Sequence, residues 1–151
     1  MIVFALRHAD RTTADELSGA GRKRAQLLAR MLAETGVSLV LHSDTKRAKD
    51  TVKPLKDKLG GALTVEEVGF GDPSNPDPDV HVAKVVDRVK AQPAAAVVAV
   101  VSHSNTVGPI LQGLGSGPVD PIGDKEFDKL FVLFRGASGS LTMLRYGVAT
   151  G

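Results

Sequence analysis

The chain has 151 residues, no cysteine, and a net charge of +2 that results from 19 basic and 17 acidic side chains. This length suits one domain with a substantial core, so we expect a single domain over residues 1–151. The lack of cysteine excludes disulfides, thiolate catalysis and cysteine-ligated zinc. The balanced charge and the low aromatic content, 4% of the residues, argue against a nucleic-acid partner.

The sequence contains no segment that predicts export or membrane insertion. The apolar stretch Met1–Leu6 is too short for a signal peptide, and no run approaches the roughly 20 apolar residues that span a bilayer. We therefore expect a cytoplasmic protein with no membrane partner. The dense basic run Arg22–Arg24 falls early in a predicted helix, and we interpret it as a solvated helix face. No sequence feature predicts an oligomeric state.

Apolar runs alternate with amphipathic segments along most of the chain, which predicts alternating strands and helices. In the first half we expect a buried strand at 2–6, a helix from the cap Ser18 to the stop Gly36, a strand at 37–41, a helix at 45–59 with a kink or early stop at Pro54, and a weaker strand at 62–66. A turn-rich loop at 69–78, a helix ending before Pro93, a central strand at 94–101 and a helix at 106–114 follow.

The last third of the chain has a different pattern. Residues 127–134 and 140–146 predict two strands around a turn at 135–139, which together form an antiparallel hairpin. The earlier strands are continuously apolar, which is typical of a parallel sheet covered by helices. We expect an α/β three-layer sandwich with a mostly parallel central sheet, helices on both faces and this C-terminal hairpin.

Polar residues follow three of the predicted strands at the point where each strand ends. They are the pairs Arg7-His8, His42-Ser43 and Ser102-His103. In open parallel sheets, ligands bind beyond the carboxyl ends of the strands. If the strand before His8 lies next to the strand before His103, the two histidines face one pocket. The helix after Ser43 adds Lys46 and Arg47 in its first turn.

Two imidazoles and two guanidinium groups suit a phosphoryl group. Arginine binds phosphate oxygens in a bidentate manner and stays charged at any relevant pH. A neutral histidine can attack phosphorus, provided that an acceptor such as a backbone carbonyl holds its other ring nitrogen. We do not predict a metal, because no two of His8, His42, His81 and His103 have the spacing of a helical ligand pair.

Four motifs in chain order resemble the histidine phosphatase (phosphoglycerate mutase-like) superfamily. Leu6-Arg7-His8-Ala9-Asp10 is similar to its Arg-His-Gly motif, and Leu17-Ser18-Gly19-Ala20-Gly21 is similar to its Leu-Thr/Ser-x-x-Gly helix start. The segment from Ser43 to Thr51 resembles its Ser-x-x-x-Arg-Ala-x-x-Thr element, and the segment from Val100 to Thr106 resembles its second histidine motif. The short chain without a capping insertion is most similar to the compact phosphohistidine phosphatase type.

The resemblance implies roles for particular residues. His8 would accept the phosphoryl group, and Arg7, Arg47 and His103 would complete the catalytic set. Further phosphate contacts would come from Ser43, Ser104 and Asn105. The resemblance implies no metal and no cofactor.

The proton donor is the part of the family pattern that this sequence does not match. Many members place a glutamate after the third strand, whereas here the candidates are Asp10, Glu66, Glu67 and Asp72, none of them in a matching motif. The predicted substrate is a small phosphomonoester or a phosphohistidine protein, because phosphohistidine has a good leaving group that needs no dedicated acid. The alternatives are a phosphate-recognising module without turnover and a phosphoglycerate mutase.

Overall fold

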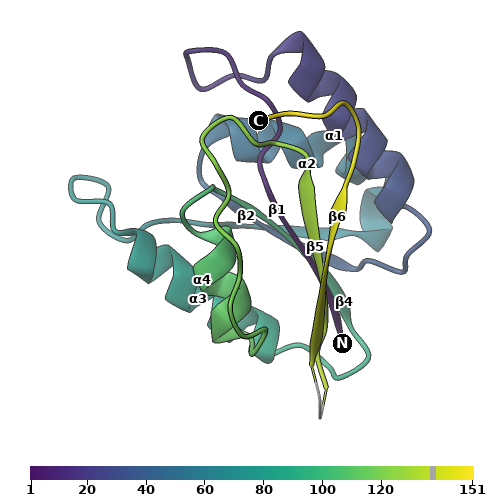
Figure 1. The fold of residues 1–151 in the computed structure, drawn as a ribbon. Coiled ribbons are helices and arrows are strands. Elements are labelled where there is room, and N and C mark those ends of the chain that lie inside the picture. The colour runs from purple at the N-terminus through teal and green to yellow at the C-terminus, as the bar shows by residue number, and fades with distance from the viewer. Residues whose placement is uncertain (137–138) are drawn as a thin grey trace.

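A computed structural model describes residues 1–136 and 139–151. One six-stranded sheet forms the centre of the molecule, with helices on either side of it (Figure 1). The strands are β1 (Ile2–Arg7), β2 (Leu39–Ser43), β3 (Thr64–Val68), β4 (Val97–Ser102), β5 (Lys129–Phe134) and β6 (Ser140–Arg145). The helices are α1 (Gly19–Leu32), α2 (Lys46–Leu59), a short 3-10 turn (Gly60–Ala62), α3 (Pro78–Lys90) and α4 (Val107–Gly113).

The strand order is β3-β2-β4-β1-β5-β6. The first four strands in this order run parallel, β5 pairs antiparallel to β1, and β6 pairs antiparallel to β5. The predicted α/β class, the mainly parallel sheet and the C-terminal hairpin are therefore confirmed. Ile2 pairs with Val97 and Arg7 with Ser102, so β1 and β4 are neighbours and end at the same edge.

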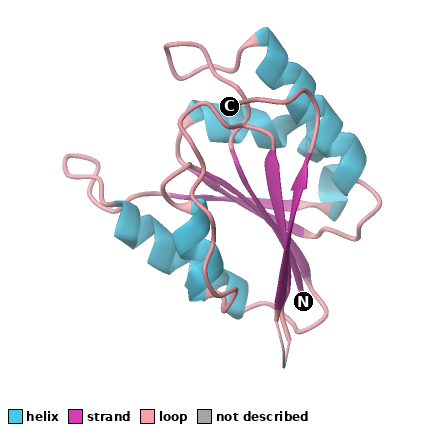
Figure 2. Cartoon of the chain, in the orientation of Figure 1, coloured by secondary structure: helices cyan, strands magenta, loops and turns pink. Residues whose placement is uncertain are grey.

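Alternate side chains of each inner strand enter two separate cores, one on each face of the sheet. Figure 2 shows helices packed on both faces of this sheet. Helices α1 and α2 cover one face, where their leucines and alanines pack on strand residues such as Leu6 and Val101. Helices α3 and α4 cover the other face and pack on residues such as Val3 and Val100. This three-layer arrangement leaves the carboxyl edge of the parallel strands uncovered by either helix pair.

Several element boundaries differ from the sequence prediction, and local causes explain two of them, the end of α2 and the start of β4. Helix α2 continues through Pro54 to Leu59, so the predicted early stop is wrong. A proline leaves the carbonyl of the residue four positions earlier without a partner. Here that residue is Asp50, which is only half-buried, so solvent can reach it. Strand β4 begins at Val97 because Pro93 and Ala96 first close a turn. Two residues of the predicted turn at 135–139, residues 137 and 138, lie outside the described part of the chain.

The interpretation of Arg22–Arg24 as a solvated face is wrong for Arg24, whose side chain is buried. Arg24 Nε donates to Asp10 Oδ1 at 2.6 Å, and its terminal nitrogens donate to the carbonyls of Tyr146 and Val148. This arginine therefore ties the segment after β1 to the C-terminal segment.

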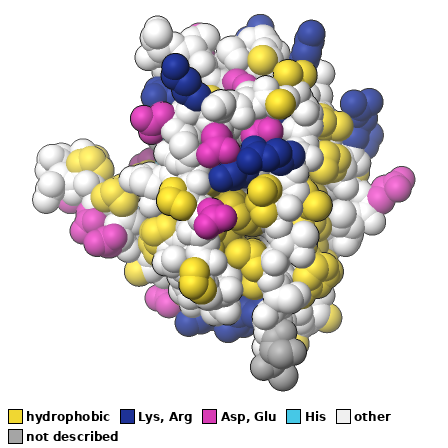
Figure 3. Space-filling view, viewed as in Figure 1, with side chains coloured by type: hydrophobic (Ala, Val, Ile, Leu, Met, Phe, Trp, Pro, Cys, Tyr) yellow, Lys and Arg dark blue, Asp and Glu magenta, His cyan; other side chains and the backbone are white. Residues whose placement is uncertain are grey.

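The outer surface mixes side chains of both charges. On the face shown in Figure 3, basic and acidic side chains are interspersed with hydrophobic ones. Among the described residues, no helix has the length and apolar character that a membrane crossing requires.

Candidate functional site

The ends of β1 and β4 bring two histidines together. His8 follows β1, and its backbone N–H donates to the carbonyl of Ser102 at 2.9 Å. His103 follows β4, and the centroids of the two imidazole rings lie 5.2 Å apart. Both side chains are buried, which is unusual for polar groups at the edge of a sheet.

Hydrogen bonds on both ring nitrogens determine the tautomer of His8. Nδ1 lies 2.8 Å from the carbonyl oxygen of Ala9, which can only accept, so Nδ1 carries the proton. Nε2 is therefore unprotonated, and it accepts a hydrogen bond of 3.2 Å from Arg47 Nε. Burial lowers the pKa of His8 to about 4, with further lowering by the Arg7 and Arg47 charges against the opposing effect of the Ala9 bond. At neutral pH the ring is uncharged and presents a lone pair on Nε2.

Arg47 lies between His8 and a carboxylate that the sequence did not indicate. Its Nη1 donates to Asp15 Oδ1 at 2.8 Å. The same carboxylate accepts from the backbone N–H groups of Lys46 and Arg47, the first residues of α2. Burial raises the pKa of Asp15, but these hydrogen bonds at the helix N-terminus and to the guanidinium together outweigh burial and hold the pKa below its usual range. Asp15 thus holds the guanidinium of Arg47 beside His8.

Backbone carbonyls bind one end of the Arg7 guanidinium, and its Nε has no partner among the described residues. Its Nη1 donates to three backbone carbonyls of one loop, those of Gly123, Asp124 and Glu126. Its guanidinium stacks on the Phe127 ring at 4.0 Å. Arg7 Nε is buried and has no hydrogen-bond partner among the described residues. A buried guanidinium N–H without a partner is costly, and an anion bound beside it would satisfy it.

His103 is held by a hydroxyl from the neighbouring strand end. Its Nε2 lies 2.8 Å from Ser43 Oγ, and Ser43 Oγ lies 3.1 Å from the hydroxyl of Thr45, the cap of α2. Burial lowers the pKa of His103 to about 3, with further lowering by His8 and the nearby arginines. Both histidines of the site are therefore neutral across the physiological pH range.

A second buried network lies beneath His103, and sequence reasoning missed it. His81 of α3 donates from Nδ1 to the carbonyl of Val68 at 2.9 Å, so its Nε2 accepts from Ser102 Oγ at 2.8 Å. Ser102 Oγ lies 2.6 Å from Thr106 Oγ1, which accepts from the backbone N–H of His103 at 3.0 Å. This chain of hydrogen bonds fixes the backbone that carries His103.

Close packing fixes the segment after His8 in a similar way. The backbone N–H of Ala9 donates to Thr51 Oγ1 on α2 at 2.9 Å. On α1, a Cβ on Gly21 would lie 1.9 Å from the carbonyl oxygen of Asp10, so only glycine fits there. Two of the motifs singled out in the sequence thus contribute backbone support: the Leu-Ser-x-x-Gly helix start and the threonine of the Arg-Ala-x-x-Thr element.

A hollow of about 390 Å³ opens beside Arg47 and His103. The predicted contact Asn105 lines it, and Ser104 is half-buried next to His103. The remaining lining residues were not predicted; they are Asp44, Thr45, Phe70, Pro76 and Pro78. Most of these come from the turn-rich loop that the sequence indicated only as a connection.

None of the four predicted proton donors lines this hollow. Asp10 is paired with Arg24, and Glu66 accepts two hydrogen bonds from Arg88, which hold the Glu66 pKa below its usual range. Asp72 accepts from the backbone and hydroxyl of Ser74, and these bonds lower its pKa. Glu67 is exposed on β3. Carboxylates near the site in the described chain include Asp44, in the hollow, Asp15, on Arg47, and Asp124, whose charge acts on Arg7.

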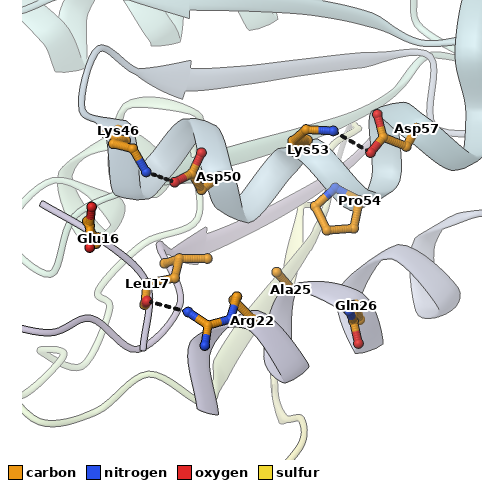
Figure 4. A pocket seen from close by; sticks show the side chains of 10 residues that line it. All are labelled: Glu16, Leu17, Arg22, Ala25, Gln26, Lys46, Asp50, Lys53, Pro54 and Asp57. Carbon is orange, nitrogen blue, oxygen red and sulfur yellow. Dashed lines mark hydrogen bonds and ion pairs between the residues drawn. The ribbon is translucent and has the colours of Figure 1, made fainter. Parts of the chain in front are cut away.

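A separate hollow of about 530 Å³ lies between α1 and α2 (Figure 4). Its charged groups neutralise each other through the ion pairs Lys46–Asp50 and Lys53–Asp57. Arg22 on the opposite wall donates to the carbonyl of Leu17. In residues 1–136 and 139–151, no group of three or more histidine, aspartate or glutamate side chains is arranged to bind a metal ion.

Residues 6–69, which include the end of β1, His8, Ser43 and Arg47, match the sequence profile of the histidine phosphatase superfamily (branch 1). This match covers less than half of the chain and agrees with the resemblance seen in the sequence motifs. The solved structures discussed next are of phosphatases with differing substrates.

Three solved structures of this fold cover nearly the whole chain. The protein histidine phosphatase SixA complexed with tungstate has a TM-score of 0.68 at 22% identity, covering 96% of this chain and 97% of its own. The α-ribazole phosphatase from Shigella flexneri has a TM-score of 0.68 at 18% identity, covering 98% and 99%. The mycobacterial glucosyl-3-phosphoglycerate phosphatase with inorganic phosphate has a TM-score of 0.66 at 18% identity, covering 98% and 97%. No curated protein sequence matches the chain. At these identities the structural matches establish the shared fold.

Proposed function

We propose that the chain is a metal-independent phosphatase that hydrolyses a phosphomonoester or a phosphohistidine through a phospho-His8 intermediate. The observation that carries the proposal is the state of His8. Its Nδ1 proton is bound by the Ala9 carbonyl, its pKa is lowered to about 4, and its Nε2 lone pair lies beside Arg47. A neutral, oriented imidazole is what nucleophilic attack on phosphorus requires.

The reaction has two steps that share one set of stabilising groups. In the first, the Nε2 lone pair forms a bond to phosphorus while the bond to the leaving atom breaks, and the leaving atom takes a proton from solvent. In the second, a water oxygen attacks phosphorus and gives up a proton to solvent, the P–N bond breaks, and the electron pair of that bond returns to Nε2. The guanidinium groups of Arg7 and Arg47 and the side chain of His103 would stabilise the equatorial oxygens in both steps. Ser43, Ser104 and Asn105 would assist.

A direct test is the hydrolysis of phenyl phosphate by the wild type and by His8→Ala. We expect turnover by the wild type and a loss of at least about 10³-fold in the variant. Rapid quenching with a ³²P-labelled substrate should trap an acid-labile label on the wild type and not on His8→Ala. Equal rates for the two proteins would refute the proposal.

The position of the carboxylates favours one alternative, a phosphate-recognising module without turnover. None of the four predicted donors lines the hollow, and Asp10 and Glu66 are engaged by arginines. Saturable binding of inorganic phosphate with no hydrolysis of phenyl phosphate or of a phosphohistidine peptide would establish this function instead.

A further inference from the structure

The two sides of the candidate site differ in chemistry. On the side of β1, Arg7 carries a positive charge, and the charge of Arg11 acts on both Arg7 and His8. On the side of β4, the hollow beyond His103 has walls from the loop between β3 and α3 and from the start of α2. Arg47 is the single cationic residue among the described residues that line this hollow.

The outer wall of the hollow is apolar and rigid. It consists of Phe70, Pro76 and Pro78. The Phe70 ring stacks on the buried His81 ring with centroids 4.6 Å apart and planes 17° from parallel. The centroid of the Phe70 ring lies 5.7 Å from that of His103. Stacking on His81 therefore fixes the position of Phe70 relative to the site.

The backbone of this loop is also fixed. The carbonyl of Phe70 accepts from the backbone N–H of Asp77 at 2.9 Å, which closes the loop at its base. Pro78 forms the first turn of α3, and prolines lose little conformational freedom when a ligand binds. We call Phe70, Pro76 and Pro78 the apolar wall.

The charge of the hollow is set by Asp44. This exposed carboxylate lines the hollow together with Arg47, which already bonds to His8 and Asp15. A ligand group in the hollow therefore meets a flat apolar surface and a carboxylate that has no hydrogen-bond partner among the described residues.

We propose that this hollow binds the leaving group of the substrate and selects a flat aromatic ring without negative charge. The inference rests on the proposed phosphatase function. The ring stacks against the apolar wall while the phosphoryl group lies between Arg7, Arg47 and His8. Leaving groups that carry a carboxylate, as phosphoglycerates do, are disfavoured by Asp44.

This substrate class also agrees with the finding that none of the four predicted acids lines the hollow. When the bond from phosphorus to a phenol oxygen or an imidazole nitrogen breaks, the electron pair departs on a group that is stable enough to leave and is then protonated by water. A sugar or glycerol alkoxide needs a general acid, which contributes about 10²–10⁴-fold. The four predicted acids do not line the hollow where that leaving atom would lie.

The charge preference is tested with a pair of substrates, phenyl phosphate and 4-carboxyphenyl phosphate. We expect kcat/KM to favour phenyl phosphate by about three- to tenfold in the wild type, from repulsion across a partly solvated gap. Asp44→Asn should bring the ratio close to one. Asp57→Asn removes an exposed carboxylate on the far end of α2 and should keep the wild-type ratio. A ratio unchanged in Asp44→Asn would overturn the assignment of the charge preference.

The apolar wall is tested with Phe70→Ala. We expect the KM for phenyl phosphate to rise about tenfold, while the inhibition constant of inorganic phosphate changes less than about twofold. An equal loss for both ligands would mean that Phe70 supports only the fold. A capped peptide phosphohistidine should show the same dependence on Phe70. The substrate with the larger kcat/KM then shows whether the site prefers an imidazole or a phenol as the leaving group.

Binding of phosphonates separates this inference from the proposed phosphatase function. Phenylphosphonate and methylphosphonate have no P–O–C bond to hydrolyse, so calorimetry measures their binding whether or not the chain turns over. We expect phenylphosphonate to bind about tenfold more tightly in the wild type and to lose this advantage in Phe70→Ala. If phenyl phosphate is not hydrolysed but this difference is present, the phosphatase function fails and the ring site stands. Equal affinities in the wild type would overturn the ring site.

Discussion

His8 and His42 have the same local structure and different surroundings. Each follows the apolar part of a parallel strand, each is buried, and each ring bonds through Nδ1 to a backbone carbonyl of the next residue, Ala9 or Ser43. His8 Nε2 accepts from Arg47, whereas His42 makes no other side-chain hydrogen bond in the described chain. The short-range bond sets the tautomer, and the side chains that converge on Nε2 decide whether the histidine can act on phosphate.

We expect the largest effect on activity when the two histidines are substituted separately. His8→Asn should lower kcat/KM for phenyl phosphate by at least about 10³-fold, because the attacking lone pair is lost. His42→Asn, the matched control, should lower it less than about threefold. Steady-state kinetics on both variants checks this, with far-UV circular dichroism to establish that each is folded. A comparable loss in both variants would show that the shared local bond, not the site, is responsible.

The second-largest expected effect concerns Arg47, whose hydrogen bond to Nε2 distinguishes His8 from His42. Arg47→Gln removes both the Nε donor to His8 and the charge beside the phosphoryl group. Loss of one such preorganised donor costs about 10²–10³-fold in kcat. The change should also weaken competitive inhibition by inorganic phosphate. Lys46→Gln, one residue earlier and paired with Asp50 on the surface, is the control and should keep kcat within about twofold.

The lowered pKa values of His8 and His103, about 4 and about 3, predict a loss of stability at mildly acidic pH. An unfolded histidine titrates near 6.5, so below this pH the unfolded state binds protons that the folded state cannot. Each such histidine lowers the free energy of unfolding by about 1.4 kcal/mol per pH unit between pH 6.5 and its folded pKa. The loss is absent above pH 6.5.

Urea denaturation at pH 7 and at pH 5 measures this linkage. The wild type should lose about 4 kcal/mol between these values if both histidines contribute fully. His8→Asn should lose less free energy of unfolding than the wild type over this range, since one titrating group is gone and the His8 charge no longer lowers the pKa of His103. An equal pH dependence in both proteins would contradict the assignment of the linkage to His8.

The smallest effect concerns Ser43, the residue next to His42. Ser43→Ala removes the hydroxyl that lies 2.8 Å from His103 Nε2. A hydrogen bond of this kind contributes about 0.5–1.5 kcal/mol, so kcat should fall about two- to tenfold. The loss in Ser43→Ala should exceed the loss in the adjacent variant His42→Asn, because consecutive side chains of a strand face opposite sides of the sheet. A change in KM alone would assign Ser43 to substrate binding.

Much of the fold could be predicted from the sequence because apolar periodicity and turn residues are local signals. The sequence identified the polar ends of both strands but left their pairing open; the structure pairs β1 with β4, which brings His8 and His103 together. Arg47 was found because it lies in the first turn of a helix that follows another such end.

The rest of the site depends on long-range packing that leaves no periodic signal. Asp15 and Phe70 lie in loops, and only the tertiary structure brings them to Arg47 and His103. Arg24 looked like a surface charge because its partners at the C-terminal end are more than a hundred positions away, with separations of 122 and 124 residues. The family pattern located a region for the acid but no residue, because the carboxylates there bind other groups.

The bonds from Arg24 to the carbonyls of Tyr146 and Val148 also have a consequence for the order of assembly. Arg24 holds Asp10, two residues from His8, so the segment that carries this histidine is completed by contacts 122 and 124 positions away along the chain. Closing contacts of such large sequence separation slows folding. During refolding, the end of the sheet that carries His8 should therefore become protected from hydrogen exchange late.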